Sequence, residues 1–174
     1  MKHLENIEDS TEKEMSDVLQ GLVGSNTENS ERNYQDYTDK IHGLQTFLLA
    51  QDQAWHGENH HFAPGVYVRE FRCFENTLLV GKTHRHEHMF ILLEGKCTVS
   101  TEDEVLTLEA PYIGKSPAGV KRALYTNTDI IWVTIHPTDE TDVAKLEEWL
   151  TVPDDEVREF REKLGLNNIK KIGD

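Results

Sequence analysis

The sequence predicts a mainly β protein, an antiparallel sandwich or closed β-barrel, with α-helices before and after it. Between Val66 and His136, short runs of β-branched and aromatic residues are separated by frequent turn signals. On either side of this region, apolar residues recur instead at helical spacing. We therefore expect a polar, acidic helical extension over 1–62, a β-barrel over 63–137 and C-terminal helices over 138–174.

The strands expected in the central region are short. They cover 66–74, one or two strands within 78–93 with a bend at Gly81, and then 96–101, 105–110, 112–116, 120–126 and 130–136. The composition of 51–65 predicts a loop that contains His56, His60 and His61. This loop is either a plain polar connection or a lid over the mouth of the barrel.

Helical patterns occupy both ends of the chain. The first covers about 11–24, with Thr11 and Glu14 as a capping box, Gly24 as its stop and an apolar stripe formed by Met15, Val18, Leu19 and Leu22. The second places apolar residues on one stripe from Tyr34 to Leu48. Two more helices are expected at about 143–150 and 153–165, the last one starting at Pro153 and ending at Gly165.

Composition limits the function classes. The 174 residues carry a net charge of −14 with a pI of about 5.0, which argues against nucleic-acid binding and against attraction to anionic membranes. No apolar run is long enough to span a bilayer, and the N-terminus lacks the apolar core of a signal peptide. The two cysteines form no disulfide framework. We expect a soluble, cytoplasmic protein.

Three histidines alternate along the segment "KTHRHEHMF". In a continuous strand, Lys82, His84, His86 and His88 share one face, with successive positions about 6–7 Å apart. Two neighbouring imidazoles can then hold one ion, whereas His84 and His88 lie about 13 Å apart unless the strand bends. The geometry therefore favours two of these histidines plus a ligand from another strand. A barrel lining without metal is the alternative, and the ammonium of Lys82 supports it.

The segment from Gly81 to Gly95, followed by "PAGVKRALYTN", resembles the paired motifs of the cupin superfamily. The resemblance covers about Val66 to His136 and implies a cupin-like antiparallel β-barrel, a double-stranded β-helix or jelly roll. The family's H-x-H and glutamate positions fall on Lys82, His84 and His88, and its second-motif histidine falls on Arg122. Two of the four usual metal positions are therefore cationic here, a departure from the usual Fe or Mn dioxygenase site.

A narrower resemblance, to small single-domain cupins encoded in bacteriophage and bacterial genomes, includes "G-x-K-R-A" and "IH-x-T-x-E-T-D". It implies a fold and a site rather than a reaction, and it directs attention to Lys121, Arg122 and His136. The cupin resemblance also implies a homodimer. Imidazole-rich sites suit Zn, Fe, Cu or Ni, and the family adds Mn.

Two functions follow from these residues. In the first, His84 and His88 bind a divalent metal together with His86 or His136, while Lys82, Arg122 and Lys121 hold a small anionic molecule. Glu70, or an unliganded histidine such as His86, then moves protons. An internal ion pair between Arg122 and an acid is the alternative to the anion.

The second function is non-catalytic. The barrel is a scaffold, and the N-terminal helices dock onto a protein partner or another copy of the chain. A phage origin makes a virion-associated or host-modulating role part of this reading. The sequence does not decide whether the protein is an enzyme.

Overall fold

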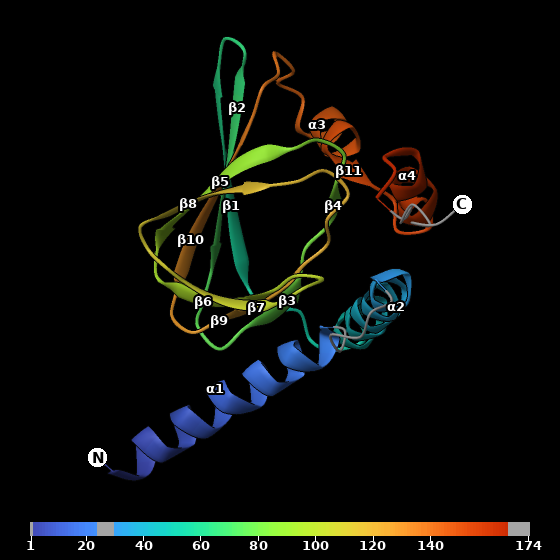
Figure 1. Ribbon diagram of the computed structural model, residues 1–174. Helices are drawn as coiled ribbons and strands as arrows, with labels where there is room; N and C mark the ends of the chain where they lie inside the picture. Colours follow the sequence, from blue (N-terminus) through green and yellow to red (C-terminus); the bar gives the residue numbers. More distant parts are fainter. Residues whose placement is uncertain (1, 24–29, 167–174) are drawn as a thin grey trace.

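The structure is a computed structural model that describes residues 2–23 and 30–166, with side chains for 11–23 and 37–166. It consists mainly of antiparallel sheets with helices along one sheet and at one end (Figure 1). The five-stranded sheet has the order β1-β2-β10-β5-β8, formed by His56–Ala63, Val66–Cys73, Ile130–His136, His88–Glu94 and Tyr112–Ser116. The four-stranded sheet has the order β3-β9-β6-β7, formed by Leu78–Val80, Ala123–Thr126, Lys96–Ser100 and Val105–Glu109.

The strand order is that of a jelly roll. Without β1 and the short strands β4 (Thr83–His84) and β11 (Thr151–Val152), the strands run β2, β3, β5, β6, β7, β8, β9 and β10. The first of these pairs with the last in one sheet, and the second pairs with the second-to-last in the other. Two interleaved Greek keys produce this pattern, in which early strands of the chain pair with late ones. The predicted fold class is therefore confirmed.

The space between the two sheets is the main core. Its buried residues come from both sheets, and their side chains are apolar. They are Cys73, Phe90, Leu92, Cys97, Val99, Leu108, Leu124 and Ile130. Both cysteines are free and buried, as expected of packing residues. At the turn between β5 and β6, Gly95 has φ of +85°, and a Cβ there would lie 2.0 Å from the carbonyl oxygen of Asp129. The break that the sequence predicts between the strands at 78–93 and 96–101 is therefore a turn at this glycine.

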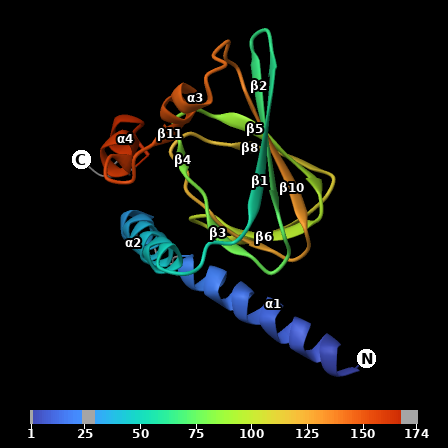
Figure 2. The same ribbon diagram turned by 180° about the vertical axis from the view of Figure 1, so that it is seen from behind.

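The N-terminal helices cover the four-stranded sheet (Figure 2). Helix α1 is Lys2–Leu22 and α2 is Ser30–Leu49. They bury a joint apolar cluster that includes Leu19, Leu22, Tyr37, Ile41, Ala123 and Tyr125. Of the predicted stripe, Leu19 and Leu22 are buried and Met15 packs beside them, whereas Val18 is 39% exposed.

The predicted start of α1 at a Thr11 capping box is wrong, because α1 begins at Lys2. Residues 2–10 contain no glycine or proline that would end a helix, so helical structure continues through the capping pattern. Gly24 and the side chain of Tyr34 lie outside the described residues.

The expectation of a loop over 51–65 is also wrong for its second half. Residues His56–Ala63 form β1, which pairs along its whole length with β2. The composition is polar because β1 is an edge strand that is mostly exposed, and such a strand needs no apolar alternation. Within the sheet, Nδ1 of His60 forms a hydrogen bond with the hydroxyl of Tyr67 at 2.7 Å.

The C-terminal elements lie at one open end of the two sheets (Figure 1). Helix α3 (Val143–Leu150) is capped by Asp142, whose carboxylate accepts hydrogen bonds from the amides of Ala144 and Lys145. Strand β11 then pairs with β4, and α4 (Val157–Lys163) follows. None of the described helices is long and apolar enough to cross a membrane.

Candidate metal centre

Three imidazoles converge at the end of the sheets where β4, β5 and β10 meet. They belong to His84, His88 and His136. The ring centroids lie 4.2 Å apart for His84 and His88, 4.7 Å for His88 and His136, and 5.6 Å for His84 and His136. One ring nitrogen from each lies within 4.8 Å of the others. His88 and His136 are buried and His84 is half-buried. Three nitrogens this close can serve one metal ion.

The chain reaches this geometry by breaking its strand. Residues 85–87 separate β4 from β5, with a bend at 85 and 86, so the segment forms two strands and the shared face expected of a continuous strand does not form. The bend shortens the separation of His84 and His88, which a straight strand would hold about 13 Å apart. Two contacts on β4 fix it: pairing of His84 with Thr151 of β11, and the amide of Gly119, which donates to the His84 carbonyl at 2.9 Å.

The third histidine comes from a neighbouring strand. In the sheet, β10 pairs with β5 so that Ile135 lies opposite Met89, which places His136 next to His88 on the inner face. Of the predicted metal ligands, which were His84 and His88 with either His86 or His136, the fold brings together His84, His88 and His136. That these three bind a metal remains a prediction.

The hydrogen bonds leave ring nitrogens available. His88 donates from Nδ1 to the backbone carbonyl of His86 at 3.1 Å, because a carbonyl can only accept. Its Nε2 then carries a lone pair. The Nδ1 of His84 and both nitrogens of His136 are buried without a hydrogen-bond partner among the described residues. Buried polar atoms without partners are costly, and a coordinated cation removes that cost.

Protonation also favours metal binding. Burial lowers the pKa of His84 to about 2 and that of His136 to about 3. Burial likewise lowers the pKa of His88, opposed by its bond to His86 and assisted by the charges of Arg122 and Arg69. All three rings are therefore neutral near pH 7, which is the form that binds metal.

The donor set fits a divalent transition metal. Three imidazoles are a ligand set that suits Zn, Fe, Cu or Ni, and with three protein ligands at least one coordination position is left for a water or a ligand atom. His84, His88 and His136 would hold such an ion, which would supply Lewis acidity beside them.

A cationic side chain lies beside the histidines. Arg122 donates from Nη1 to the hydroxyl of Ser116 at 3.1 Å, and Ser116 is the cross-strand partner of His88. Its guanidinium also lies 5.9 Å from the centroid of the Phe90 ring. Among the side chains described for 11–23 and 37–166, no carboxylate lies within ion-pair distance of Arg122. The alternative of an internal ion pair for Arg122 therefore finds no partner in this part of the chain.

The other predicted site residues lie elsewhere. His86 turns away from the cluster and packs its ring on Trp149 at 4.3 Å. Lys82 is 67% exposed and bonds to Glu147 of α3. Glu70 is on the outer face of β2, where it accepts hydrogen bonds from Asn59 and Arg72. The side chains of Lys82 and Glu70 form their bonds outside the cluster, because the bend and the strand alternation direct them outward. His86 meets the cluster through its backbone carbonyl, which accepts the hydrogen bond from His88.

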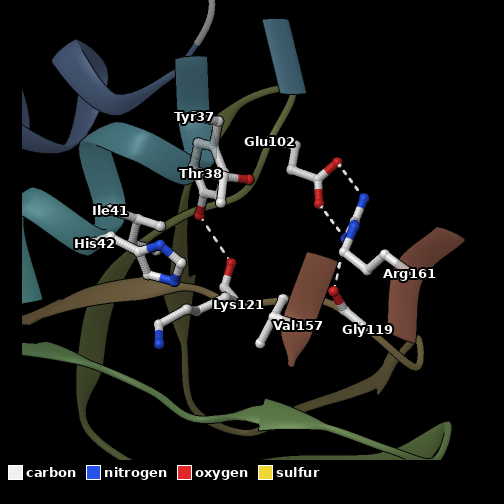
Figure 3. Close-up of a pocket in the computed structure, with 9 residues that line it drawn as sticks. All are labelled: Tyr37, Thr38, Ile41, His42, Glu102, Gly119, Lys121, Val157 and Arg161. Carbon is white, nitrogen blue, oxygen red and sulfur yellow. Dashed lines mark hydrogen bonds and ion pairs between the residues drawn. The ribbon is translucent and has the colours of Figure 1, made fainter. Parts of the chain in front are cut away.

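Lys121 belongs to a separate polar pocket, shown in Figure 3. Its ammonium group forms an ion pair with Asp154 at 2.5 Å, and its backbone carbonyl accepts a hydrogen bond from the Tyr37 hydroxyl at 2.9 Å. Nearby, Arg161 forms two bonds with Glu102 and a third with the Gly119 carbonyl. The pocket is lined by Tyr37, Thr38, Ile41, His42, Glu102, Gly119, Lys121, Val157 and Arg161. Its polar groups join α2 and α4 to the sheets.

Sequence reasoning missed two inward-facing polar residues, Arg69 and Thr134. Arg69 alternates with Tyr67, Phe71 and Cys73, of which Tyr67 and Cys73 are buried. The signal was present, since inward apolar residues at 67, 71 and 73 leave 69 on the same face. Glu70, which we predicted as a proton carrier, lies with Arg72 at the alternate positions of β2.

Comparisons with known proteins concern the fold. No protein-family profile and no curated protein matches the sequence. A cupin superfamily protein from Desulfitobacterium hafniense shares 13% identity at a TM-score of 0.42, over 52% of this chain and 85% of its own. A cupin-2 domain containing protein from Shewanella frigidimarina shares 16% at 0.41, over 55% and 92%.

Salicylate 1,2-dioxygenase from Pseudoaminobacter salicylatoxidans, in adducts with gentisate, shares 16% identity at a TM-score of 0.46. The match covers 66% of this chain and 34% of that enzyme. The solved structures similar to this chain include cupin superfamily proteins. The class defined by the chain's own strand order and site is a jelly-roll protein with a cluster of three histidines.

Proposed function

We propose that the protein binds a divalent transition metal through His84, His88 and His136, and that Arg122 holds a small anionic molecule next to that metal. The observation that carries the proposal is the set of three converging ring nitrogens, several of them buried without hydrogen bonds. Arg122 supports the anion, because its charge is half-buried beside His88 and has no acidic partner among the described side chains. An arginine can hold a carboxylate with two hydrogen bonds.

The alternative, a scaffold that docks partners through its N-terminal helices, has less support. The buried apolar residues of α1 and α2, which are Leu19, Leu22, Tyr37 and Ile41, pack against the chain's own sheet, whereas Val18, Phe47 and Leu49 stay exposed. Most of the predicted docking stripe is therefore occupied within the molecule, whereas the histidine nitrogens are not.

Metal analysis tests the first half of the proposal. Protein loaded with Zn²⁺ and desalted is expected to retain about one equivalent, and His84→Ala, His88→Ala and His136→Ala are each expected to reduce that amount strongly. His86→Ala is the matched control: it removes an imidazole two residues from His88 but keeps the backbone carbonyl to which His88 donates. Retention below about a tenth of an equivalent by the unaltered protein would contradict the proposal.

Calorimetry with butyrate tests the second half. Metal-loaded protein is expected to bind this carboxylate, and Arg122→Gln is expected to weaken binding by about tenfold or more through loss of a charge-assisted contact. Lys115→Gln makes the same change of charge at an exposed lysine that pairs with Glu87, and it should leave the affinity unchanged. Equal effects of the two substitutions would show that Arg122 acts only through overall charge.

A further inference from the structure

A second guanidinium lies close enough to the three histidines for its charge to act on all of them. Arg69 lies on β2 between Tyr67, which is buried, and Phe71, which packs against the main core, so its side chain leaves the same inner face. Its partner across the sheet is Thr134 of β10, two residues before His136. The charge of Arg69 lowers the pKa of His84 and His136, after the larger effect of burial.

A hydroxyl without a partner lies between the two arginines. The Oγ1 of Thr134 is buried and has no hydrogen-bond partner among the described residues. Thr134 pairs with Arg69 on one side and with Phe90 on the other. Because Arg122 lies over the Phe90 ring, the order across the sheet is Arg69, Thr134 and then Arg122. Two strand spacings separate Arg69 from Phe90, about 10 Å between backbones, and long arginine side chains shorten the gap.

Arg69 forms only a weak ion pair with Glu147. Its Nη1 lies 3.6 Å from Oε2 of Glu147, beyond ordinary hydrogen-bond length. The other oxygen of Glu147 bonds to Lys82, and the Glu147 side chain is 37% exposed on α3. Glu147 can therefore release Arg69 and keep a cationic partner in Lys82. An incoming anion would replace one long, partly screened contact rather than break a buried ion pair.

We infer that the ligand of this site carries two anionic groups, a small dicarboxylate, with one carboxylate on Arg122 and the other on Arg69, which Glu147 occupies when the ligand is absent. The inference rests on the proposed function, because it places the ligand beside the same three histidines. Thr134 donates its free hydroxyl to the ligand between the two arginines. Glu147 is an internal competitor for the ligand's second carboxylate.

Succinate and butyrate test the inference, since they share four carbons and differ by one carboxylate. Calorimetry on the metal-loaded protein is expected to show succinate binding at least about tenfold more tightly than butyrate. Arg69→Gln should remove most of this difference, because it weakens succinate binding much more than butyrate binding. Glu147→Gln should strengthen succinate binding several-fold, because the competing carboxylate is gone, and leave butyrate unchanged. Effects of opposite sign at two residues in contact do not follow from a loss of stability.

The control is Glu148→Gln, which removes the same charge from an exposed neighbouring position of α3. If Glu148→Gln strengthens succinate binding as much as Glu147→Gln does, the role of Glu147 is overturned. Succinate that binds no more tightly than butyrate, in a protein whose butyrate binding depends on Arg122, would overturn the two-carboxylate inference and leave the proposed function standing. Absence of both metal retention and butyrate binding would overturn the proposed function itself.

Discussion

At the scale of single residues, the site depends on neutral imidazoles held away from water. His136 is fully buried, and neither of its ring nitrogens has a hydrogen-bond partner among the described residues. Burial keeps its pKa at about 3, whereas an unfolded chain has a histidine pKa of about 6.5. Protonation therefore favours the unfolded chain at any pH below about 6.5.

This difference predicts how stability depends on pH in the metal-free protein. The contribution of His136 is fully present above pH 6.5 and is lost progressively as the pH falls from 6.5 toward about 3. Between pH 6.5 and 5.5 the free energy of unfolding should fall by about 1 kcal/mol from this residue alone. Urea unfolding with a chelator present measures it, and His136→Gln should reduce the slope. A slope that the substitution leaves unchanged would contradict the assignment.

The close packing of Phe90 against Gly114 on β8 predicts that a larger residue at position 114 destabilises the fold. A Cβ at this position would lie 2.3 Å from Cζ of Phe90, whose ring stacks on Trp132 at 4.4 Å and lies beneath Arg122. Gly114→Ala is therefore expected to lower the free energy of unfolding by about 1–3 kcal/mol.

The matched control for this substitution is Gly43→Ala, at an exposed position in α2 where a Cβ meets nothing within 4 Å. It should raise the free energy of unfolding by about 0.5–1 kcal/mol, because alanine favours a helix. Denaturant unfolding of both variants gives the comparison, and two changes of the same sign would contradict the packing argument.

At the scale of elements, helix α2 is joined to the sheets by a buried hydrogen bond. The Tyr37 hydroxyl donates to the Lys121 carbonyl at 2.9 Å, and burial raises the Tyr37 pKa to about 12, so the hydroxyl keeps its proton. Tyr37→Phe should cost about 1–3 kcal/mol in the free energy of unfolding, since the buried carbonyl loses its partner.

Tyr125→Phe is the comparison for this substitution. Tyr125 lies in the same apolar cluster, but its hydroxyl donates to the side chain of Asn76, which is exposed and can bond to water instead. The cost should therefore be smaller. Urea unfolding followed by circular dichroism measures both, and equal costs would show that the bond to Lys121 contributes nothing of its own.

At the scale of the whole molecule, negative charge is in large excess. The net charge is −14, and the excess carboxylates repel one another in the compact state. Raising NaCl from about 0.01 to about 0.15 M shortens the screening length from about 30 to about 8 Å. We expect the Tm to rise by about 2–4 °C, which corresponds to about 1 kcal/mol in a chain of this size. Choline chloride should give the same rise, and a fall in Tm would show that attractive surface ion pairs outweigh the repulsion.

Much of this architecture was predictable because its signals are local. Alternating residues and turns such as the one at Gly95 fix short strands wherever they occur. The homodimer and the phage origin implied by resemblance remain predictions. The edge strand β1 was missed for a local reason as well: its exposed residues carry no apolar alternation, and it exists only because β2 pairs with it.

The sequence by itself determined a set of short strands, flanking helices and a group of candidate histidines, because each depends on neighbours within a few residues. Only the tertiary structure decided which side chains meet. The bend between β4 and β5 and the pairing of β10 with β5 bring His84, His88 and His136 together, and they send His86 to Trp149 instead. Arg69 and Arg122 are 53 positions apart in the numbering, and only the tertiary structure places both near the three histidines, Arg69 through the pairing of β2 with β10 and Arg122 through its contacts with Ser116 and Phe90. Contacts between distant segments arise from burial of the whole core, which no local pattern encodes.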